Sequence, residues 1–571
     1  MNHCAVLSVA SPVAAAAAAN PEAGHTATDM ANNLAGSRVG TRVDIRAAGR
    51  DPVHARPARP SRRFARRVLP TLIASIVASA CAMVAAVPAF AQVQPAGHEN
   101  GQTAQTAAGA VGKSVNAPTP QAPPAGARTA SAIGQPEAGT TEFQLSNGMQ
   151  VIVKEDHRAP TVVHQIWYRT GGIDEVSGTT GVAHMLEHMM FKGTPKVPVG
   201  EFSRQIALLG GRENAMTNRD FTLYYQQISK QYLPKMMELE ADRMANLIIR
   251  KDEFEREMKV VMEERRLRTD DSPRGKVYEQ LLATVYTAAP YRHPVIGWMD
   301  DLVNMRVDDV AAWYREWYVP NNALLVVAGD VKPDEVRALA ERYYGKLKPR
   351  PLPLRKTQLE APQQGIKRVW VKAPAENPYI VLAYKVPRLH DVENDVDPYA
   401  LEVLSAVLDG YDNARLNREL VRQQRLADDV NVGYDSINRG ESLFVLDGIP
   451  ANGHTTQEIE KALREEVQRI AKDGVSEEEL KRVKAQVVAG QIYKRDSVFG
   501  QGMEIGVAEI AGISWRQIDR MLDKIKAVTP AQVQAVAARY FSDDNLTVAT
   551  LLPQPIDPNK PKTPAPGGLR H

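Results

Sequence analysis

The chain has 571 residues, and one hydrophobic core rarely grows beyond about 250–300 residues, so we expect at least two domains. Apolar residues make up 44% of the chain and charged residues 24%, as in ordinary soluble globular proteins. Residues 1–91 hold ten Arg and four Asp or Glu, which gives this segment a net charge of +6. Because the whole chain has a net charge of +3, the remaining residues carry a net charge of −3. This mildly acidic body gives no electrostatic reason to expect nucleic acid as a partner.

A secretory signal is predicted near the N-terminus. Residues 62–67 hold four arginines, residues 68–86 are an apolar run, and Ala89-Phe90-Ala91 is a small-x-small cleavage pattern. That order is typical of a signal peptide. We therefore expect a non-structural extension at 1–60, a signal peptide at 61–91, and a mature periplasmic protein of a Gram-negative bacterium with no stable membrane anchor. If the signal is retained, the run is about long enough to anchor the chain in a membrane.

The cysteines restrict the chemistry of any metal site. Both of them, Cys4 and Cys81, precede the predicted cleavage point after Ala91. The mature protein would contain no thiol, so it could form neither a disulfide nor a cysteine-ligated metal site. Any zinc must therefore be held by histidine and carboxylate side chains.

Changes in composition divide the rest of the chain. Residues 92–138 are rich in Ala, Gly, Pro, Gln and Thr, which bury too little apolar surface to offset the entropy lost on ordering, so we expect a disordered linker. The Pro-rich tail at 554–571 is expected to be disordered as well, and the Pro-rich segment 349–362 is interpreted as a connector. Two domains are then predicted, at 139–348 and 363–553.

The first half is predicted to begin with a β-hairpin. Strands at 143–145 and 150–154 flank Ser146-Asn147-Gly148, which is a turn signal. The other elements expected there, in chain order, are a strand at 162–168, helices at 179–192, 200–210, 230–248 and 252–269, a buried strand at 324–328 and a helix at 332–347.

The second half repeats this order of strands and helices. Its expected elements are strands at 369–372 and 379–384, helices at 396–409 and 414–424, a strand at 442–449, helices at 455–473 and 476–493, and a strand at 546–552. The repeated order predicts two α+β domains of comparable size.

The predicted helix 179–192 carries a metal-binding pattern. His184 and His188 lie four residues apart, so they share one face of the helix, one turn apart. Two imidazoles placed in this way can bind one zinc ion at about 2.0–2.1 Å. Glu187 lies beside them, where a carboxylate can take a proton from a zinc-bound water. This is the H-x-x-E-H pattern of the inverted zincins.

The surroundings of the pattern favour a metal site. Thr179 or Thr180 can cap the start of the helix, and Gly193 can end it. The same pattern can arise by chance on a polar helix face. Here the other residues of the helix are mostly apolar, which predicts a buried helix, and buried histidines and a glutamate need partners. A metal ion supplies them.

A third ligand is expected from another helix, because catalytic zinc sites usually have three protein ligands and an open position for water. The helix 252–269 offers Glu257 and Glu264, which lie seven residues and two turns apart on one face. We expect Glu264 to complete a site for one zinc ion per chain and Glu257 to be an outer carboxylate that orients a histidine. The basic run 265–268 is interpreted as a solvated helix end.

At these positions the chain resembles the pitrilysin–insulinase family of zinc peptidases, in particular its two-domain bacterial and mitochondrial-processing-type members. The resemblance covers about residues 140–553. The matching features are Leu145-Ser146-Asn147-Gly148, the Gly171-Gly172 turn, the His184 to His188 motif with a glutamate 76 residues after His188, Gly210-Gly211 followed by Asn214-Ala215-Met216-Thr217, and Val326-Val327-Ala328-Gly329-Asp330.

The resemblance implies two homologous domains, each a mostly antiparallel sheet packed with helices, of which only the first is catalytic. It implies that His184, His188 and Glu264 bind zinc, and that Glu187 activates water and then protonates the leaving amine. It also implies that Asn214, Ala215, Met216 and Thr217 form an edge strand that pairs with the backbone of a peptide substrate. These four residues could instead form an ordinary turn before a strand at 222–226.

One feature of the family is missing from this sequence. Members that act alone usually carry an arginine and a tyrosine seven residues apart in the second half, where this chain has Val421 and Asp428. We therefore expect the zinc-bearing subunit of a heterodimer, whose homologous partner lacks the histidine motif and supplies the pair. The rival interpretation is a homodimer or monomer that stabilises the oxyanion through Tyr224 or Arg439.

The predicted function is an exported zinc endopeptidase that cleaves peptides or unfolded proteins. One alternative is a non-catalytic scaffold or processing-complex subunit that keeps the fold, although the intact motif with Glu264 argues against it. Another is a different zinc hydrolase on the same fold. His293 is expected to be a structural residue of its loop.

Overall fold

The computed structural model describes residues 139–356, 358 and 360–558, and these fall within one compact unit. The predicted extension, signal peptide and linker lie outside the described residues, as does most of the predicted tail. In the part of the chain that is described, no helix combines the length and the apolar character needed to span a membrane.

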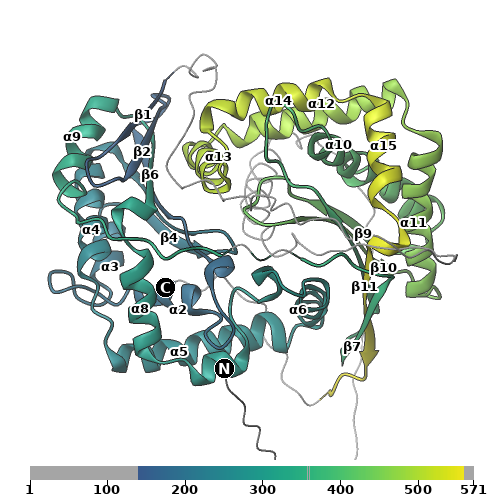
Figure 1. Ribbon diagram of the computed structural model, residues 1–571, viewed down its shortest axis with the longest axis horizontal. Helices are drawn as coiled ribbons and strands as arrows, with labels where there is room; N and C mark the ends of the chain where they lie inside the picture. The colour runs from purple at the N-terminus through teal and green to yellow at the C-terminus, as the bar shows by residue number, and fades with distance from the viewer. Residues whose placement is uncertain (1–138, 357, 359, 559–571) are drawn as a thin grey trace, which may run out of the picture. The chain divides into compact units, whose positions relative to one another are not determined.

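The first half forms a six-stranded sheet in the order β1-β2-β6-β3-β5-β4 (Figure 1). The strands are β1 (Thr140–Gln144), β2 (Gln150–Glu155), β3 (Thr161–Tyr168), β4 (Arg212–Thr217), β5 (Thr222–Ser229) and β6 (Ala323–Gly329). Only β2 and β6 run parallel, and the other neighbours are antiparallel. The central strands β3 and β6 are buried almost throughout, which explains the continuous apolar sequence of β6, while β3 also contains the buried polar residues His164 and Gln165.

The first half also contains helices, most of which pack around this sheet or against one another. They are α2 (Val182–Met189), α3 (Glu201–Leu208), α4 (Leu233–Asn246), α5 (Lys251–Arg265), α6 (Pro273–Val285), α7 (Met299–Asn304), α8 (Val307–Trp317) and α9 (Pro333–Tyr343). The helix α5 continues into a π-helical segment, η4 (Arg266–Asp270). Short 3-10 segments are η2 (Gly172–Asp174), η3 (Lys230–Tyr232), η5 (Pro290–Arg292) and η6 (Pro320–Asn322).

The second half forms a five-stranded sheet in the order β7-β11-β8-β10-β9, in which only β7 and β11 run parallel. Its strands are β7 (Lys367–Pro374), β8 (Tyr379–Val386), β9 (Ala427–Tyr434), β10 (Ser442–Pro450) and β11 (Leu546–Gln554). Its helices are α10 (Asp397–Asp409), α11 (Thr456–Asp473), α12 (Glu477–Lys494), α13 (Val498–Ala511), α14 (Ile518–Ala527) and α15 (Pro530–Tyr540), with η7 (Asn417–Gln423), η8 (Trp515–Gln517) and η9 (Asp543–Asn545) between them. The predicted fold class, two α+β domains with mostly antiparallel sheets, is confirmed, while the domain boundaries stay a prediction.

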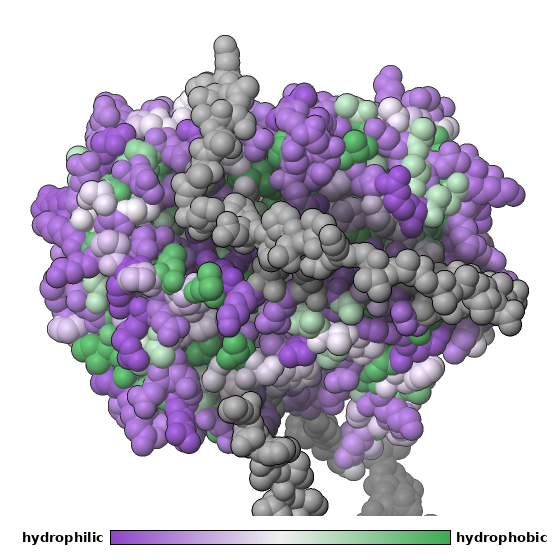
Figure 2. Space-filling model, viewed as in Figure 1, coloured by the Kyte–Doolittle hydropathy of each residue, from purple (hydrophilic) through white to green (hydrophobic). Residues whose placement is uncertain are grey.

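Two elements cross from one half to the other. The helix α6 of the first half packs against β7 and β11, and α13 of the second half packs against β3 and β6. A Cβ atom at Gly506 of α13 would lie 2.2 Å from the ring of Trp167, so glycine at this position permits the close approach. On the face shown in Figure 2, apolar residues are scattered among hydrophilic ones.

Several segments differ from the sequence-based expectation. The predicted helix at 414–424 is largely the π-helical η7. The strand β9 and the helices α6 to α8 and α13 to α15 were not predicted.

Candidate metal centre

The helix α2, which carries both histidines, is buried along its whole length and is fixed at its start by a remote carboxylate. Glu175 accepts hydrogen bonds from the backbone N–H groups of Gly181 and Ala183, each at 2.9 Å. The predicted cap by Thr179 or Thr180 is wrong: the Thr180 hydroxyl donates to Asp301 at 2.5 Å, and the Thr179 hydroxyl donates to the carbonyl of Val176. Glu175 therefore sets where α2 begins.

Three side chains from two helices converge on one point. The Oε2 atom of Glu264 on α5 lies 3.7 Å from Nε2 of His184 and 3.5 Å from Nε2 of His188. One ligand atom from each of these residues lies within 4.8 Å of the others, and all three side chains are buried. Ligands at about 2.0–2.2 Å from a tetrahedral zinc lie roughly 3.3–3.6 Å apart, so the donor set and its spacing fit zinc.

A second carboxylate lies behind the site. Nδ1 of His188 lies 3.2 Å from Glu257, whose other oxygen pairs with Lys192 at 2.8 Å. Burial acts to raise the pKa of Glu257, but His188 and Lys192 outweigh it and lower the pKa to about 2. An ionised carboxylate on Nδ1 leaves Nε2 to face a metal, which is the arrangement expected for an outer-shell residue.

Glu264 is itself held by a residue that the sequence analysis did not single out. Its other oxygen pairs with Nη1 of Arg268 at 2.8 Å. Arg268 belongs to the basic run interpreted as a solvated helix end, and Lys192 was not considered either. Arg268 lies four residues after Glu264, and this spacing on one helix is a signal that could have found it, whereas Lys192 reaches Glu257 from a different part of the chain and no local spacing indicates that pair.

Glu187 lies on α2 between the two histidines and is 3% exposed. The hydroxyl of Thr217 donates a hydrogen bond to its Oε2 atom at 2.5 Å. Burial raises the pKa of Glu187, against the lowering effect of this hydrogen bond. A buried carboxyl with a raised pKa is suited to exchange protons near neutral pH.

Thr217 ends β4, and the residues 214–217 form a strand rather than a turn. The strand pairs with β5 in the register Asn214 to Tyr225 and Ala215 to Tyr224. Among the described residues β4 has no partner on its other side, so it is an edge strand with open backbone groups. The interpretation as a turn is wrong. The side-chain contact of Thr217 with Glu187 was not predicted.

The two residues considered as oxyanion donors are engaged elsewhere. Tyr224 is fully buried, and its hydroxyl lies 3.0 Å from the hydroxyl of Tyr318. Arg439 makes a two-pronged ion pair with Asp174. These contacts give neither residue a visible role at the metal centre.

The remaining predicted positions lie in the second half and in a loop. Val421 lies in η7, and Asp428 lies on β9. His293 is buried, contacts Ser177 at 3.3 Å and accepts a hydrogen bond from Nε of Arg292 at 3.1 Å.

Two protein-family models and several known proteins match this chain. Residues 150–297 match the family described as Insulinase (Peptidase family M16), and residues 304–487 match the Peptidase M16 inactive domain. The zinc protease PqqE of Helicobacter pylori is 31% identical over 430 residues, which are 72% of this chain and 92% of that protein. A solved protease structure from Helicobacter pylori is 29% identical, has a TM-score of 0.69, and covers 73% of this chain and 100% of its own.

A further solved structure shares the fold at low sequence identity. It is described as a peptidase M16 inactive domain from Pseudomonas fluorescens, is 16% identical with a TM-score of 0.66, and the match covers 73% of this chain and 98% of that one.

Proposed function

The chain belongs to the insulinase family of peptidases, M16, and from this membership we propose that it is an exported zinc endopeptidase that cleaves peptides or unfolded proteins. The observation that carries the proposal is the convergence of His184, His188 and Glu264 beside Glu187. Two imidazoles and one carboxylate are a donor set that fits zinc, and Glu187 is left over to act as the base.

The chain's own residues divide the work as follows. His184, His188 and Glu264 would hold one zinc ion, and Glu257 keeps the His188 ring oriented through Nδ1. A zinc ion bound there would act as a Lewis acid and would lower the pKa of a water molecule bound to it to about 7. Glu187 takes a proton from the attacking water and passes it to the nitrogen of the leaving amine.

The substrate is proposed to bind along β4. An extended peptide that pairs with the open edge would lie next to Thr217 and therefore beside Glu187. Backbone pairing recognises an extended chain with little regard to sequence, which favours peptides and unfolded segments as substrates. Asn214, Ala215 and Met216 would then contact the substrate backbone and its alternate side chains.

The test combines metal content with one conservative variant. The purified protein should carry about one zinc ion per chain, and Glu187→Gln should keep the zinc while peptide hydrolysis falls by about 10²–10⁴-fold. A scaffold that only retains the fold need not bind zinc. Wild-type activity in the Glu187→Gln variant would contradict the proposed role.

We also propose that the active form is a heterodimer with a homologous subunit that lacks the histidine motif. Val421 and Asp428 stand where the arginine and tyrosine are expected, and Tyr224 and Arg439 are engaged in other contacts. The partner would supply the missing pair. Robust hydrolysis by the single chain alone, at one-chain stoichiometry, would rule this assembly out.

Export is the remaining part of the proposal. The predicted signal at 61–91 supports a periplasmic enzyme, and N-terminal sequencing of the protein from a periplasmic fraction should begin at Gln92. Recovery of the uncleaved chain in the membrane fraction would indicate an anchored form instead.

A further inference from the structure

Two turns of the first half lie against each other near the metal centre. One follows β3, and the other joins β4 to β5. The backbone N–H groups of Gly172 and Ile173 donate to the carbonyls of Asn218 and Arg219, at 3.1 and 2.7 Å. A Cβ atom on Gly171 would lie 2.5 Å from the carbonyl oxygen of Asn218. Glycine at position 171 therefore allows the first turn to support the β4–β5 hairpin.

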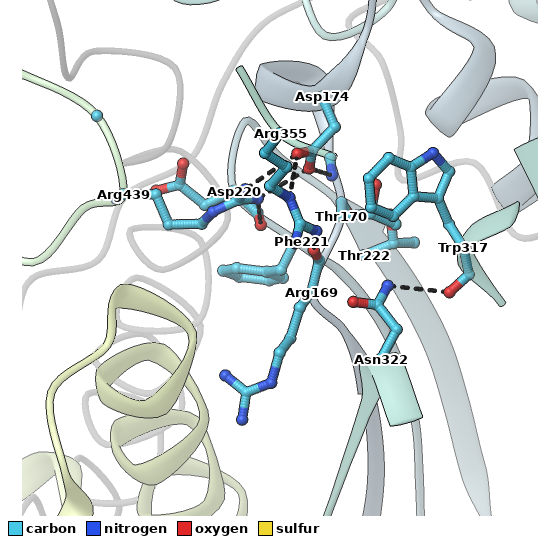
Figure 3. Close-up of polar contacts among 12 residues, drawn as sticks. Arg169, Thr170, Asp174, Asp220, Phe221, Thr222, Trp317, Asn322, Arg355 and Arg439 are labelled. Atoms are coloured by element: carbon cyan, nitrogen blue, oxygen red, sulfur yellow. Dashed lines mark hydrogen bonds and ion pairs between the residues drawn. The ribbon is translucent and has the colours of Figure 1, made fainter. Parts of the chain in front are cut away.

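An arginine from the second half binds both turns (Figure 3). Arg439, in the loop between β9 and β10, pairs with the two carboxylate oxygens of Asp174 at 2.9 and 3.0 Å. Its Nη1 also donates to the carbonyl of Asp220 at 2.8 Å, and its backbone N–H donates to the Asp220 carboxylate at 3.0 Å. One side chain thus joins the turn after β3 to the tip of the hairpin.

Neighbouring groups hold the same two carboxylates. Nε of Arg355, from the connector, donates to Asp174 at 2.7 Å, and the Tyr291 hydroxyl donates to Asp220. The backbone N–H of Gly440 in turn donates to the Tyr291 hydroxyl at 2.7 Å. Burial acts to raise the pKa of Asp174, but Arg439 and Arg355 outweigh it and hold the pKa low, so this carboxylate is charged at neutral pH.

The hairpin that Arg439 binds also carries Thr217, which contacts the proposed general base Glu187. Thr217 directly precedes Asn218, whose backbone N–H donates to the carbonyl of Phe221 and closes the turn at 3.0 Å. The Thr217 hydroxyl lies 2.5 Å from Oε2 of Glu187. A continuous series of contacts therefore leads from Arg439, across the hairpin, to Glu187.

We propose that Arg439 is a positioning residue for catalysis: it holds the β4–β5 hairpin of the first half so that Thr217 orients Glu187. The inference rests on the proposed function and adds to it. It assigns the second half a role at the general base, although none of the grouped metal ligands comes from that half. A hydrogen bond to a charged group at this distance restricts the carboxylate to one orientation.

The first test is a double-mutant cycle on the zinc-loaded protein, in the assembly that shows activity. Thr217→Val should lower kcat by roughly 10- to 100-fold without changing KM or zinc content, because it removes one hydrogen bond to a charged group. Thr217→Ser should restore most of kcat. Arg439→Gln should also lower kcat at unchanged zinc content.

The combination decides whether the two residues act together. The double variant Arg439→Gln with Thr217→Val should have about the same kcat as Thr217→Val alone, because Arg439 acts through Thr217. Losses in kcat that multiply would overturn the proposal, since they would mean that Arg439 acts independently of the hydrogen bond to Glu187.

A matched control is available at the opposite edge of the same sheet. Arg516 of the second half donates to Glu142 on β1, far along the strand order from β4. Arg516→Gln also removes an ion pair between the halves but leaves the hairpin alone, so its kcat should stay within about twofold of wild type. An equal loss of kcat in both arginine variants would indicate general loosening of the two halves and would overturn the proposal.

Hydrogen–deuterium exchange separates this inference from the proposed function. Arg439→Gln should speed exchange of the backbone amides in residues 217–222, and Arg516→Gln should not. Exchange can be measured without catalysis. Faster exchange in Arg439→Gln would therefore support the contact between Arg439 and the hairpin even if the protein cleaves no peptide. In that case only the proposed function would fail. Unchanged exchange in Arg439→Gln would overturn the inference whatever the activity.

Discussion

At the scale of single residues, His188 of the proposed metal centre has a carboxylate beside each of its ring nitrogens. Glu257 lies on its Nδ1 side and Glu264 on its Nε2 side. Burial acts to lower its pKa, but these two carboxylates raise it to about 9. A metal that binds at Nε2 must therefore displace a proton, while Glu257 keeps the ring oriented by accepting from Nδ1.

The outer carboxylate gives a first prediction. Glu257→Gln should weaken zinc binding by about 10- to 100-fold without unfolding the protein, because the amide no longer carries the charge that pairs with His188 and Lys192. Competition with a chelator measures the affinity. Glu255→Gln is the matched control, because Glu255 lies on the same helix but is exposed. Equal zinc affinity in both variants would show that Glu257 does not support the site.

The Asp174 carboxylate gives a second prediction, on pH. Its folded-state pKa lies below the usual 3.8, so the stability that it contributes is fully present above that value and is lost as the pH falls through the lowered pKa. Asp174→Asn leaves the partly buried Arg439 and the more exposed Arg355 without their anion, and because water still reaches both, the cost at pH 7 should lie below the about 3–5 kcal/mol of a fully buried pair.

The difference in the free energy of unfolding between wild type and Asp174→Asn should be constant from pH 8 to pH 5 and should shrink only below about pH 4. Urea unfolding at several pH values measures it. A difference that already shrinks between pH 8 and pH 5 would mean that the carboxyl is not held in its charged form.

The placement of single residues was predictable where it depends on spacing along one helix. His184, Glu187 and His188 follow from the four-residue period, and Glu257 and Glu264 follow from the seven-residue spacing. The contact between Thr217 and Glu187 joins residues 30 positions apart on a strand and a helix, and no local pattern encodes such a pair. The ion pair between Arg439 and Asp174 joins residues 265 positions apart, and no local sequence pattern indicates it either.

At the scale of elements, α13 depends on packing rather than on helix propensity. It contains Gly500, Gly502 and Gly506, and glycine in a helix costs about 1 kcal/mol relative to alanine. Propensity therefore predicted no helix here. Gly502 and Gly506 allow α13 to approach β3 closely, and the apolar surface that α13 buries against the sheet compensates for the weak propensity.

This packing gives a third prediction. Gly506→Val would place carbon atoms where the Trp167 ring lies, so the variant should lose about 1–3 kcal/mol or more in the free energy of unfolding. Urea unfolding measures the loss. Gly490→Val is a control in α12, because a Cβ atom there meets no atom within 4 Å, and it should be neutral or slightly stabilising, since valine has a higher helix propensity than glycine. Equal losses in the two variants would contradict the packing argument.

The strand β9 was missed for a related reason. Its sequence includes Asp428, Asp429 and Asn431, and these residues are depleted in strands. The strand exists because it pairs with β10 along most of its length. In contrast, β6 was predicted because it is apolar throughout, as expected for a central strand buried on both faces, and β3 was predicted because most of its residues are apolar.

At the scale of the whole molecule, the two halves repeat one fold but contribute different residues to the proposed site. The first half supplies the three residues of the proposed metal site, and the second half supplies α13, which packs against the sheet, and Arg439, which binds the hairpin. The repetition was visible in the sequence as a repeated order of elements. Which faces of the halves meet was not, because it depends on contacts between residues hundreds of positions apart.

The central claim is that His184, His188 and Glu264 bind one zinc ion. A crystal structure of the zinc-loaded protein, with anomalous scattering measured at the zinc absorption edge, tests it most directly. The account predicts one zinc about 2.0–2.2 Å from Nε2 of each histidine and from a carboxylate oxygen of Glu264. A zinc bound elsewhere, or one that leaves Glu264 outside its coordination shell, would contradict it.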